Sequence, residues 1–174
     1  SKASMSDEEM INLTSFIFDK SDEYGWDPYL PIAVMWKESK FNKFAFGDFR
    51  DSGLFQFLPS TAYMISSLAG VDYYRNIEFD PLDSAKLWFA YMKTLIDSFD
   101  GNLNCALLAY NMGESTLTHL ADMKVDKKTG RINIENANLK QVKKTIYYNK
   151  GRKPYDEEVI KLMEYLRTKG SRED

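Results

Sequence analysis

The amino-acid sequence predicts a mainly α-helical fold with at most a small β-hairpin. Apolar residues recur at helical spacing in several stretches, as Met10, Leu13 and Ile17 do after Ser6. Only residues 124–134 alternate weakly around a turn, so they are the one candidate hairpin. With 174 residues the chain is expected to form a single domain, 1–174, that buries a core without disulfide bonds.

The first two predicted helices lead to an irregular loop. Acidic residues follow Ser6 as in a helix N-terminus, and Gly25 ends that first amphipathic stretch. A second helix is expected with Pro31 in its opening turn and Glu38 near its C-terminal end. Between positions 42 and 53 the periodicity fails, which predicts a loop.

The later helices begin at proline or polar turn residues. One helix is expected to start at Pro59 and a longer one at Pro81. Residues 103–110 form a strongly apolar helix that ends at positions 111–113, so its last residue stands where a buried helix meets a loop. After Pro154, acidic residues and an amphipathic pattern predict the final helix.

Charge and hydropathy exclude two broad classes. A net charge of −3 gives no global basic field, which argues against a dedicated nucleic-acid-binding protein. No apolar run approaches the about 20 residues of a transmembrane helix. Residues 1–6 also lack the apolar core of a signal peptide. The sequence therefore predicts neither a nucleic-acid partner nor a transmembrane segment.

The single cysteine and the single histidine are not expected to be functional. Cys105 is followed by apolar residues, so it is predicted to be a buried thiol that packs as a small hydrophobic side chain. His119 has no neighbours of the kind found in a metal site or a nucleophilic triad. Without a metal-ligand cluster or a phosphate-binding glycine loop, the sequence implies no metal and no cofactor.

Three short segments, at 38–42, 53–56 and 109–113, combine residues suited to cleaving a glycan. Glu38 can protonate a glycosidic oxygen if burial holds its carboxyl in the neutral form. Gln56 follows a glycine and two apolar residues, so packed backbone can hold its amide while it donates and accepts bonds with hydroxyl or acetamido groups. Together these pieces indicate a sugar-cleaving site built around one glutamate.

Each segment also has a structural interpretation when it is taken alone. Glu38 can be a solvated helix residue that pairs with Lys37 or Lys40, as most glutamates are. Tyr110 and Asn111 can simply cap a helix, or the phenol can orient a nearby carboxyl. The combination of the three segments favours the functional interpretation.

In this order and spacing, the segments resemble the catalytic domain of Slt-type lytic transglycosylases, members of the lysozyme-like superfamily. The resemblance covers roughly residues 22–120. The family pattern has a Glu-Ser pair, a Gly-Leu-Met-Gln element, a Pro-x-Thr-Ala turn and a closing Ala-Tyr-Asn-x-Gly. This chain matches it at 38–39, 53–56, 59–62 and 109–113. The resemblance implies a lysozyme-like helical domain that acts on peptidoglycan.

The resemblance also implies a mechanism and a set of site residues. Glu38 is implied to act first as general acid on the bond from N-acetylmuramic acid to N-acetylglucosamine, and then as general base. The sugar's own 6-hydroxyl then closes a 1,6-anhydro ring, and no water is consumed. Tyr110 is implied to orient Glu38. The implied substrate-binding residues are Ser39, Phe55, Gln56, Tyr110 and Asn111.

Several positions depart from the family pattern. Lys43 stands where proline is usual, and Gly47 where a substrate-contacting serine is common. Arg50 and Asp51 replace a frequent Gly-Ala pair, and Phe55 replaces methionine. The missing serine hydroxyl is expected to weaken one sugar contact, whereas Phe55 keeps an apolar surface. These departures concern how the sugar is bound, while the glutamate is kept.

Two alternatives stay open at the level of sequence. A goose-type lysozyme resembles the same fold but hydrolyses the bond, and Asp48 or Asp51 could activate its water, given a carboxyl separation of about 6.5–9.5 Å. These loop aspartates can equally cap turns or pair with Arg50. A noncatalytic wall-binding or assembly protein is the other alternative, and the intact Glu38 argues against it.

Partners and location follow from the implied function. Glycan strands of peptidoglycan are the expected partner, and the location is the periplasm or cell envelope. The basic stretch 140–153 can face the anionic wall or an envelope-assembly protein, although such a stretch is more commonly a solvated surface.

Overall fold

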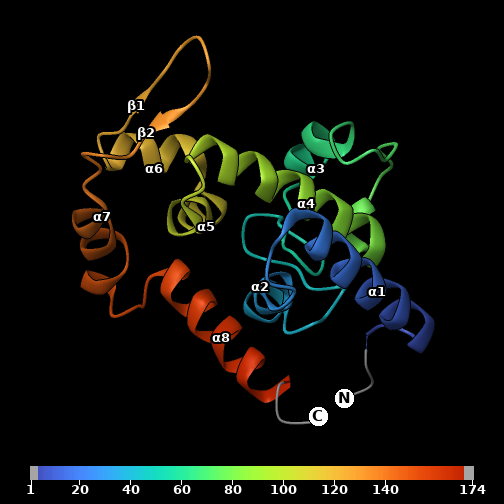
Figure 1. The fold of residues 1–174 in the computed structure, drawn as a ribbon. Coiled ribbons are helices and arrows are strands. Elements are labelled where there is room, and N and C mark those ends of the chain that lie inside the picture. The colour runs from blue at the N-terminus through green and yellow to red at the C-terminus, as the bar shows by residue number, and fades with distance from the viewer. Residues whose placement is uncertain (1–3, 171–174) are drawn as a thin grey trace. The chain divides into compact units, whose positions relative to one another are not determined.

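The computed structural model describes residues 4–170, and it confirms a mainly helical fold with one small hairpin (Figure 1). Residues 1–3 and 171–174, the two ends of the predicted domain, lie outside the described residues, as does part of the segment tested for a signal peptide. The elements are α1 (Asp7–Tyr24), α2 (Tyr29–Ser39), α3 (Pro59–Ser66), η1 (Ile77–Phe79), α4 (Pro81–Ser98), α5 (Leu103–Met112), α6 (Glu114–Leu120), β1 (Lys124–Val125), β2 (Ile132–Asn133), α7 (Leu139–Ile146), η2 (Tyr148–Lys150) and α8 (Tyr155–Gly170).

The chain divides into two compact units. The first unit runs to Tyr91 and takes up the chain again from Leu162, and the second unit spans Met92–Lys161. Both boundaries fall inside helices, α4 and α8. The first unit therefore contains Glu38 and the loop that follows it, and the second contains Tyr110 and Asn111. That residues 1–174 act as one domain stays a prediction.

Local signals set the ends of the first helix of the first unit. Ser6 and Glu9 form a reciprocal capping box, with the Glu9 amide 3.2 Å from the Ser6 hydroxyl and the Ser6 amide 2.8 Å from the Glu9 carboxylate. Gly25 ends α1 in the left-handed conformation at φ 66°. Both ends are where the sequence predicts them.

Aromatic side chains make up much of the core of the first unit. Trp88 of α4 is fully buried and stacks on Phe55, with ring centroids 5.5 Å apart. Trp26 meets Trp88 edge to face and stacks on Phe89 at 5.8 Å. Since Phe55 precedes Gln56 directly, this core anchors the loop that carries the predicted site.

The second unit is built on α5, whose residues 105–109 are all buried. β1 and β2 pair antiparallel, with Val125 opposite Ile132, and form the hairpin between α6 and α7 (Figure 1). Asp156, at the start of α8, is fully buried and accepts hydrogen bonds from Lys143 at 2.6 Å and from Asn104 at 2.8 Å. Burial alone would lower the pKa of Lys143, but its bonds to acidic partners outweigh this and raise that pKa.

The short helices α6 and α7 are not delimited by the sequence analysis, which treats residues 140–153 only as a basic stretch. The signals for α7 are nevertheless present, because the Asn138 side chain caps the helix and apolar residues follow at helical spacing. Only Val142 of α7 is buried, and the lysines read as a charged stretch although they form the polar face of an amphipathic helix.

We expect the Cys105 thiol to make the folded protein less stable at high pH. It is fully buried in α5, as the sequence predicts, and burial raises its pKa to about 11. The pKa of the thiol is higher in the folded protein than in the unfolded chain, so the neutral thiol favours the folded state. This contribution to stability is present below about pH 8.5 and is lost as the pH rises to about 11. Over that window, urea denaturation is expected to show wild-type unfolding free energy falling by about 2–3 kcal/mol more than that of Cys105→Ala.

Comparing the pH dependence rather than the absolute stability removes the cost of the cavity that alanine leaves. Burial raises the pKa of Tyr147 to about 12, and this contribution is common to both proteins. Parallel curves for the wild type and Cys105→Ala would contradict the assignment to the thiol.

Candidate active site

Glu38 lies one residue before the end of α2 and is half-buried, so the prediction of its place in the helix is confirmed. The two residues that follow Ser39 are both left-handed, with φ of 54° at Lys40 and 61° at Phe41. This conformation costs a residue with a side chain about 1–2 kcal/mol. Backbone strain of this kind is concentrated at functional sites, and here it directly follows the predicted catalytic acid.

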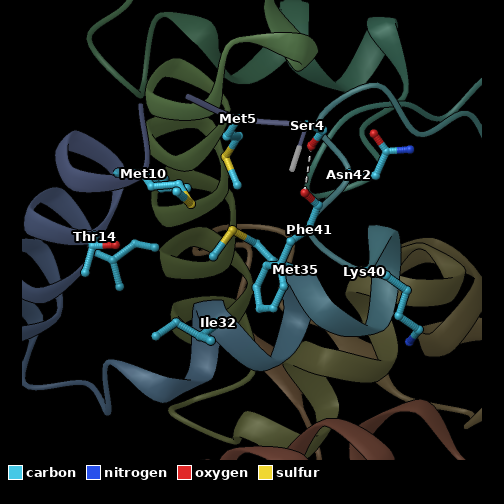
Figure 2. A pocket seen from close by; sticks show the side chains of 11 residues that line it. Ser4, Met5, Met10, Thr14, Ile32, Met35, Lys40, Phe41 and Asn42 are labelled. Carbon is cyan, nitrogen blue, oxygen red and sulfur yellow. Dashed lines mark hydrogen bonds between the residues drawn. The ribbon is translucent and has the colours of Figure 1, made fainter. Parts of the chain in front are cut away.

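The N-terminal segment supports this strained turn. The Ser4 hydroxyl donates to the Phe41 carbonyl at 2.9 Å and accepts from the Lys43 amide at 3.0 Å; Figure 2 shows the first of these bonds. A cavity of about 590 Å³ adjoins the turn, and the residues that line it include Met10 of α1 and Met35 of α2 (Figure 2). The conformation next to Glu38 is thus held by bonds to a segment far away in the sequence.

Ser39 ties α2 to the Gly-Leu-Phe-Gln loop. Its side chain is buried, and its hydroxyl lies 2.9 Å from the Leu54 carbonyl and 3.0 Å from the Met35 carbonyl. Since the hydroxyl is engaged within the protein, its contribution is to fix the distance between the helix and the loop. The structure therefore brings Glu38 and the loop 53–56 together through Ser39.

Gln56 is held by the main chain of its own loop. It adopts the left-handed conformation at φ 51°, and its Nε2 group donates to the carbonyls of Gly53 at 2.9 Å and Ala45 at 3.2 Å. Both N–H groups of the amide are thereby used, which leaves Oε1 to accept a bond from a ligand. The sequence predicts that Gln56 both donates to and accepts from a ligand, whereas in the structure only its oxygen is left to bind one, as an acceptor.

Phe55 has no exposed surface, and its ring stacks on Trp88. A ring in this position cannot offer its face to a sugar, so the structure gives this predicted substrate-binding residue a place in the core. Its physical contribution is to hold the adjacent Gln56 by packing.

Two departures from the family pattern, at Gly47 and Asp51, explain one another. A Cβ atom added to Gly47 would lie 2.0 Å from Oδ2 of Asp51, so the carboxylate occupies the space of a side chain at position 47. The Asp51 side chain accepts from the Phe49 amide at 3.1 Å, and its carbonyl accepts from the Gly47 amide at 2.8 Å. Glycine at 47 thus makes room for aspartate at 51.

In the second unit, Tyr110 and Asn111 lie in the last turn of α5, which continues to Met112. The helix is therefore longer than predicted, and both residues are helical. The Tyr147 hydroxyl donates to Oδ1 of Asn111 at 2.8 Å, so the Asn111 amide nitrogen is the group left for a ligand. The Tyr110 ring lies 6.3 Å from that of Tyr155.

Tyr147, which fixes the Asn111 side chain within the second unit, is not predicted from the sequence. It is buried, whereas the adjacent Tyr148 is half exposed. No local pattern separates the two tyrosines, because what distinguishes Tyr147 is a bond to a residue 36 positions earlier. Burial, with a smaller effect of the Asp156 charge, raises the pKa of Tyr147 to about 12, so the hydroxyl stays a donor at neutral pH.

Two kinds of feature are absent from the part of the chain that the structure describes. Residues 4–170 contain no group of three or more histidine, cysteine, aspartate or glutamate side chains that could hold a metal ion. None of the helices described is long and apolar enough to cross a membrane. Of the predicted site residues, the first unit holds Glu38 and Gln56, and the second unit holds Tyr110 and Asn111.

The fold is mainly helical, and Ser39, next to Glu38 at the end of α2, bonds the Gly-Leu-Phe-Gln loop. These features together are typical of a lysozyme-like domain. The family model described as "Transglycosylase SLT domain" matches residues 15–134, which is more than half of the chain. The chain belongs to this family, and the resemblance stated from the sequence motifs is confirmed.

A solved structure supports the same fold. The chain is similar to the lytic transglycosylase Slt from Pseudomonas aeruginosa, solved as an inactive mutant in which glutamine replaces a glutamate, with 24% identity and a TM-score of 0.56. The match covers 60% of this chain and 17% of that one. The chain thus corresponds to a small part of the larger Pseudomonas protein.

Proposed function

We propose that this protein is a peptidoglycan lytic transglycosylase in which Glu38 carries the chemistry. The observation that supports this most is the family match over 15–134, which includes Glu38, the loop 53–56 and Tyr110. The strained turn beside Glu38 and its tie to the Gln56 loop support the same assignment. The inactive Pseudomonas aeruginosa mutant, with glutamine in place of a glutamate, also favours a glutamate as the reacting group.

In the proposed reaction, Glu38 moves one proton in each of two steps. Its carboxyl first donates a proton to the oxygen between N-acetylmuramic acid and N-acetylglucosamine, and the bond from that oxygen to the muramic anomeric carbon breaks. The carboxylate then takes the proton of the muramic 6-hydroxyl, whose oxygen bonds to the anomeric carbon. The acid is regenerated, and the product carries a 1,6-anhydro ring.

The remaining site residues are proposed to bind and orient the substrate. Gln56 accepts from a sugar hydroxyl or acetamido N–H through Oε1, because its own N–H groups are engaged. Asn111 donates through its amide nitrogen, because Tyr147 bonds its oxygen. From the resemblance alone, Tyr110 is proposed to orient the Glu38 carboxyl. Ser39 and Phe55 are proposed to act by holding the loop.

The test of this function is the chemistry of the ends that the protein produces. Purified peptidoglycan is digested with the wild type and with Glu38→Gln, and the fragments are identified by mass spectrometry. Anhydro-muramic ends from the wild type, absent with Glu38→Gln, are expected. Reducing muramic ends would instead show hydrolysis and direct attention to Asp48 and Asp51. An absence of fragments from the wild type would favour the noncatalytic wall-binding alternative.

Location and partners are proposed from the substrate. Peptidoglycan is the proposed partner, so the proposed location is the periplasm or cell envelope, where peptidoglycan is found. Exposed lysines of α7, Lys140 and Lys144, offer a basic surface to the anionic wall or to an envelope-assembly protein.

Tyr147→Phe tests the proposed role of Asn111. Removing the hydroxyl leaves the Asn111 side chain without the bond that fixes it, so the KM for solubilised peptidoglycan strands is expected to rise about 2- to 10-fold, with kcat nearly unchanged. Tyr148→Phe is the matched control, since that hydroxyl bonds Glu157 on an exposed surface. An equal change in both variants would contradict a specific role for Tyr147.

A further inference from the structure

Three exposed phenylalanines lie within one short stretch of sequence, residues 44–49, on the loop after Glu38. Phe44, Phe46 and Phe49 are 57%, 75% and 84% exposed. Such an accumulation of exposed aromatic rings is unusual for a free surface, and exposed apolar patches commonly mark binding sites. These residues are not used by the chemistry of Glu38, and the family motifs do not include them.

Two of these rings, Phe44 and Phe46, pack against a fourth phenylalanine, Phe79. The Phe79 ring of η1 lies 5.1 Å from that of Phe46 and 6.2 Å from that of Phe44. We refer to Phe44, Phe46 and Phe79 as the phenylalanine cluster. Because the rings support one another, a ligand that binds them has little side-chain motion to arrest. The cluster is exposed and also pre-organised.

The phenylalanine cluster is directly connected to the Gln56 loop. Ala45, between Phe44 and Phe46, accepts hydrogen bonds through its carbonyl from the Gly53 amide at 3.0 Å and from the Gln56 side chain at 3.2 Å. Phe46 also forms a β-bridge with Ser52. The backbone that carries the rings is therefore the same backbone that fixes the proposed sugar-reading amide.

The chemistry of a saccharide fits this surface. A pyranose ring presents a face of C–H groups while its hydroxyls point outward, and the negative face of an aromatic ring attracts such hydrogens. Around the rings, Asp48 and Arg50 are exposed and can meet sugar hydroxyls. A bilayer is the less suitable occupant, because inserting the loop would carry the Asp48 carboxylate toward the lipid.

We propose that the phenylalanine cluster is a glycan subsite that stacks against a sugar ring of the peptidoglycan strand outside the scissile bond. This inference rests on the proposed function, and it adds a binding surface that this chain builds from its own loop residues. It predicts that the protein binds long strands more tightly than short ones, and that Phe46 contributes to the difference.

The test measures binding without cleavage. In the Glu38→Gln background, affinities for fluorescently labelled, peptide-free glycan strands are measured for a short and a long strand. Phe46→Ala is expected to weaken binding of the long strand about 2- to 10-fold and to leave the short strand unaffected. Phe46→Tyr keeps a flat ring and should bind like the parent, whereas Phe46→Leu should behave like alanine. Tyr63→Ala, another exposed aromatic residue that packs on Tyr73, is the matched control.

The outcomes separate this inference from the proposed function. If the Glu38→Gln protein binds the long strand and Phe46→Ala binds it equally well, the subsite is excluded while the proposed function stands. If the parent binds no strand, the proposed function itself loses its support. If Phe46→Ala instead lost binding to vesicles of phosphatidylglycerol while its glycan binding stayed unchanged, the proposed glycan subsite would be excluded. The phenylalanine cluster would then be assigned to binding a membrane surface.

Discussion

Gly53→Ala is expected to destabilise the first unit by about 3 kcal/mol or more and to abolish glycan cleavage. A Cβ at this position would lie 1.9 Å from the carbonyl oxygen of Glu78 and 2.7 Å from its carbon, both backbone atoms. Glu78 is itself buried in η1, so neither segment can yield without disturbing the core. Gly53 is also left-handed, at φ 79°, which adds strain for any side chain.

The effect on activity follows from the bonds that Gly53 makes. Its amide donates to Ala45 at 3.0 Å, and its carbonyl accepts from the Gln56 side chain at 2.9 Å. A shift that relieves the clash with Glu78 therefore displaces the Gln56 amide. Unfolding free energy from chemical denaturation and the rate of release of peptidoglycan fragments measure the two effects.

Gly25→Ala is the matched control for this substitution. Gly25 has a similar φ of 66°, but no atom lies within 4 Å of a Cβ added there. This variant therefore carries only the cost of the left-handed conformation, about 1–2 kcal/mol. Equal destabilisation by the two substitutions would show that the backbone conformation, and not the close approach of Glu78, decides the effect at Gly53.

Features that rest on neighbouring residues could be predicted from the sequence. The capping box of Ser6 and the glycine stop at Gly25 delimit α1 because each acts within one turn of the helix. The turn at 126–130 gives the hairpin for the same reason. Glu38 could be placed near the end of α2 because Pro31 marks the opening turn of that helix and the periodicity fails from position 42.

The parts of the site that rest on long-range contacts could not be predicted. Tyr147 reaches Asn111 across 36 positions, and Ser4 reaches Phe41 across 37. The close approach of Gly53 to the Glu78 backbone could not be predicted either, because a glycine in a sequence does not indicate which distant residue it contacts. Local patterns thus identify the reacting groups, whereas the bonds that orient them appear only in the folded chain.

Glu38→Gln is expected to lower the rate of peptidoglycan cleavage by about 10²- to 10⁴-fold, the usual contribution of general acid–base catalysis. Glutamine is nearly isosteric with glutamate, but at neutral pH it neither gives a proton to the glycosidic oxygen nor takes one from the 6-hydroxyl. The position is half-buried near a helix end, so the fold should tolerate the change. Rates are measured from dye-labelled peptidoglycan, with circular dichroism to verify folding.

In Glu38→Gln we expect the catalytic rate to fall without a matching loss of affinity for glycan strands. Gln56 and Asn111 are unchanged in Glu38→Gln, so affinity for glycan strands should stay close to that of the wild type while kcat falls. Glu164→Gln removes the same charge from an exposed position of α8 in the first unit, and it should cleave at the wild-type rate. If both substitutions slowed cleavage equally, the loss would reflect net charge, and a different residue would have to supply the proton.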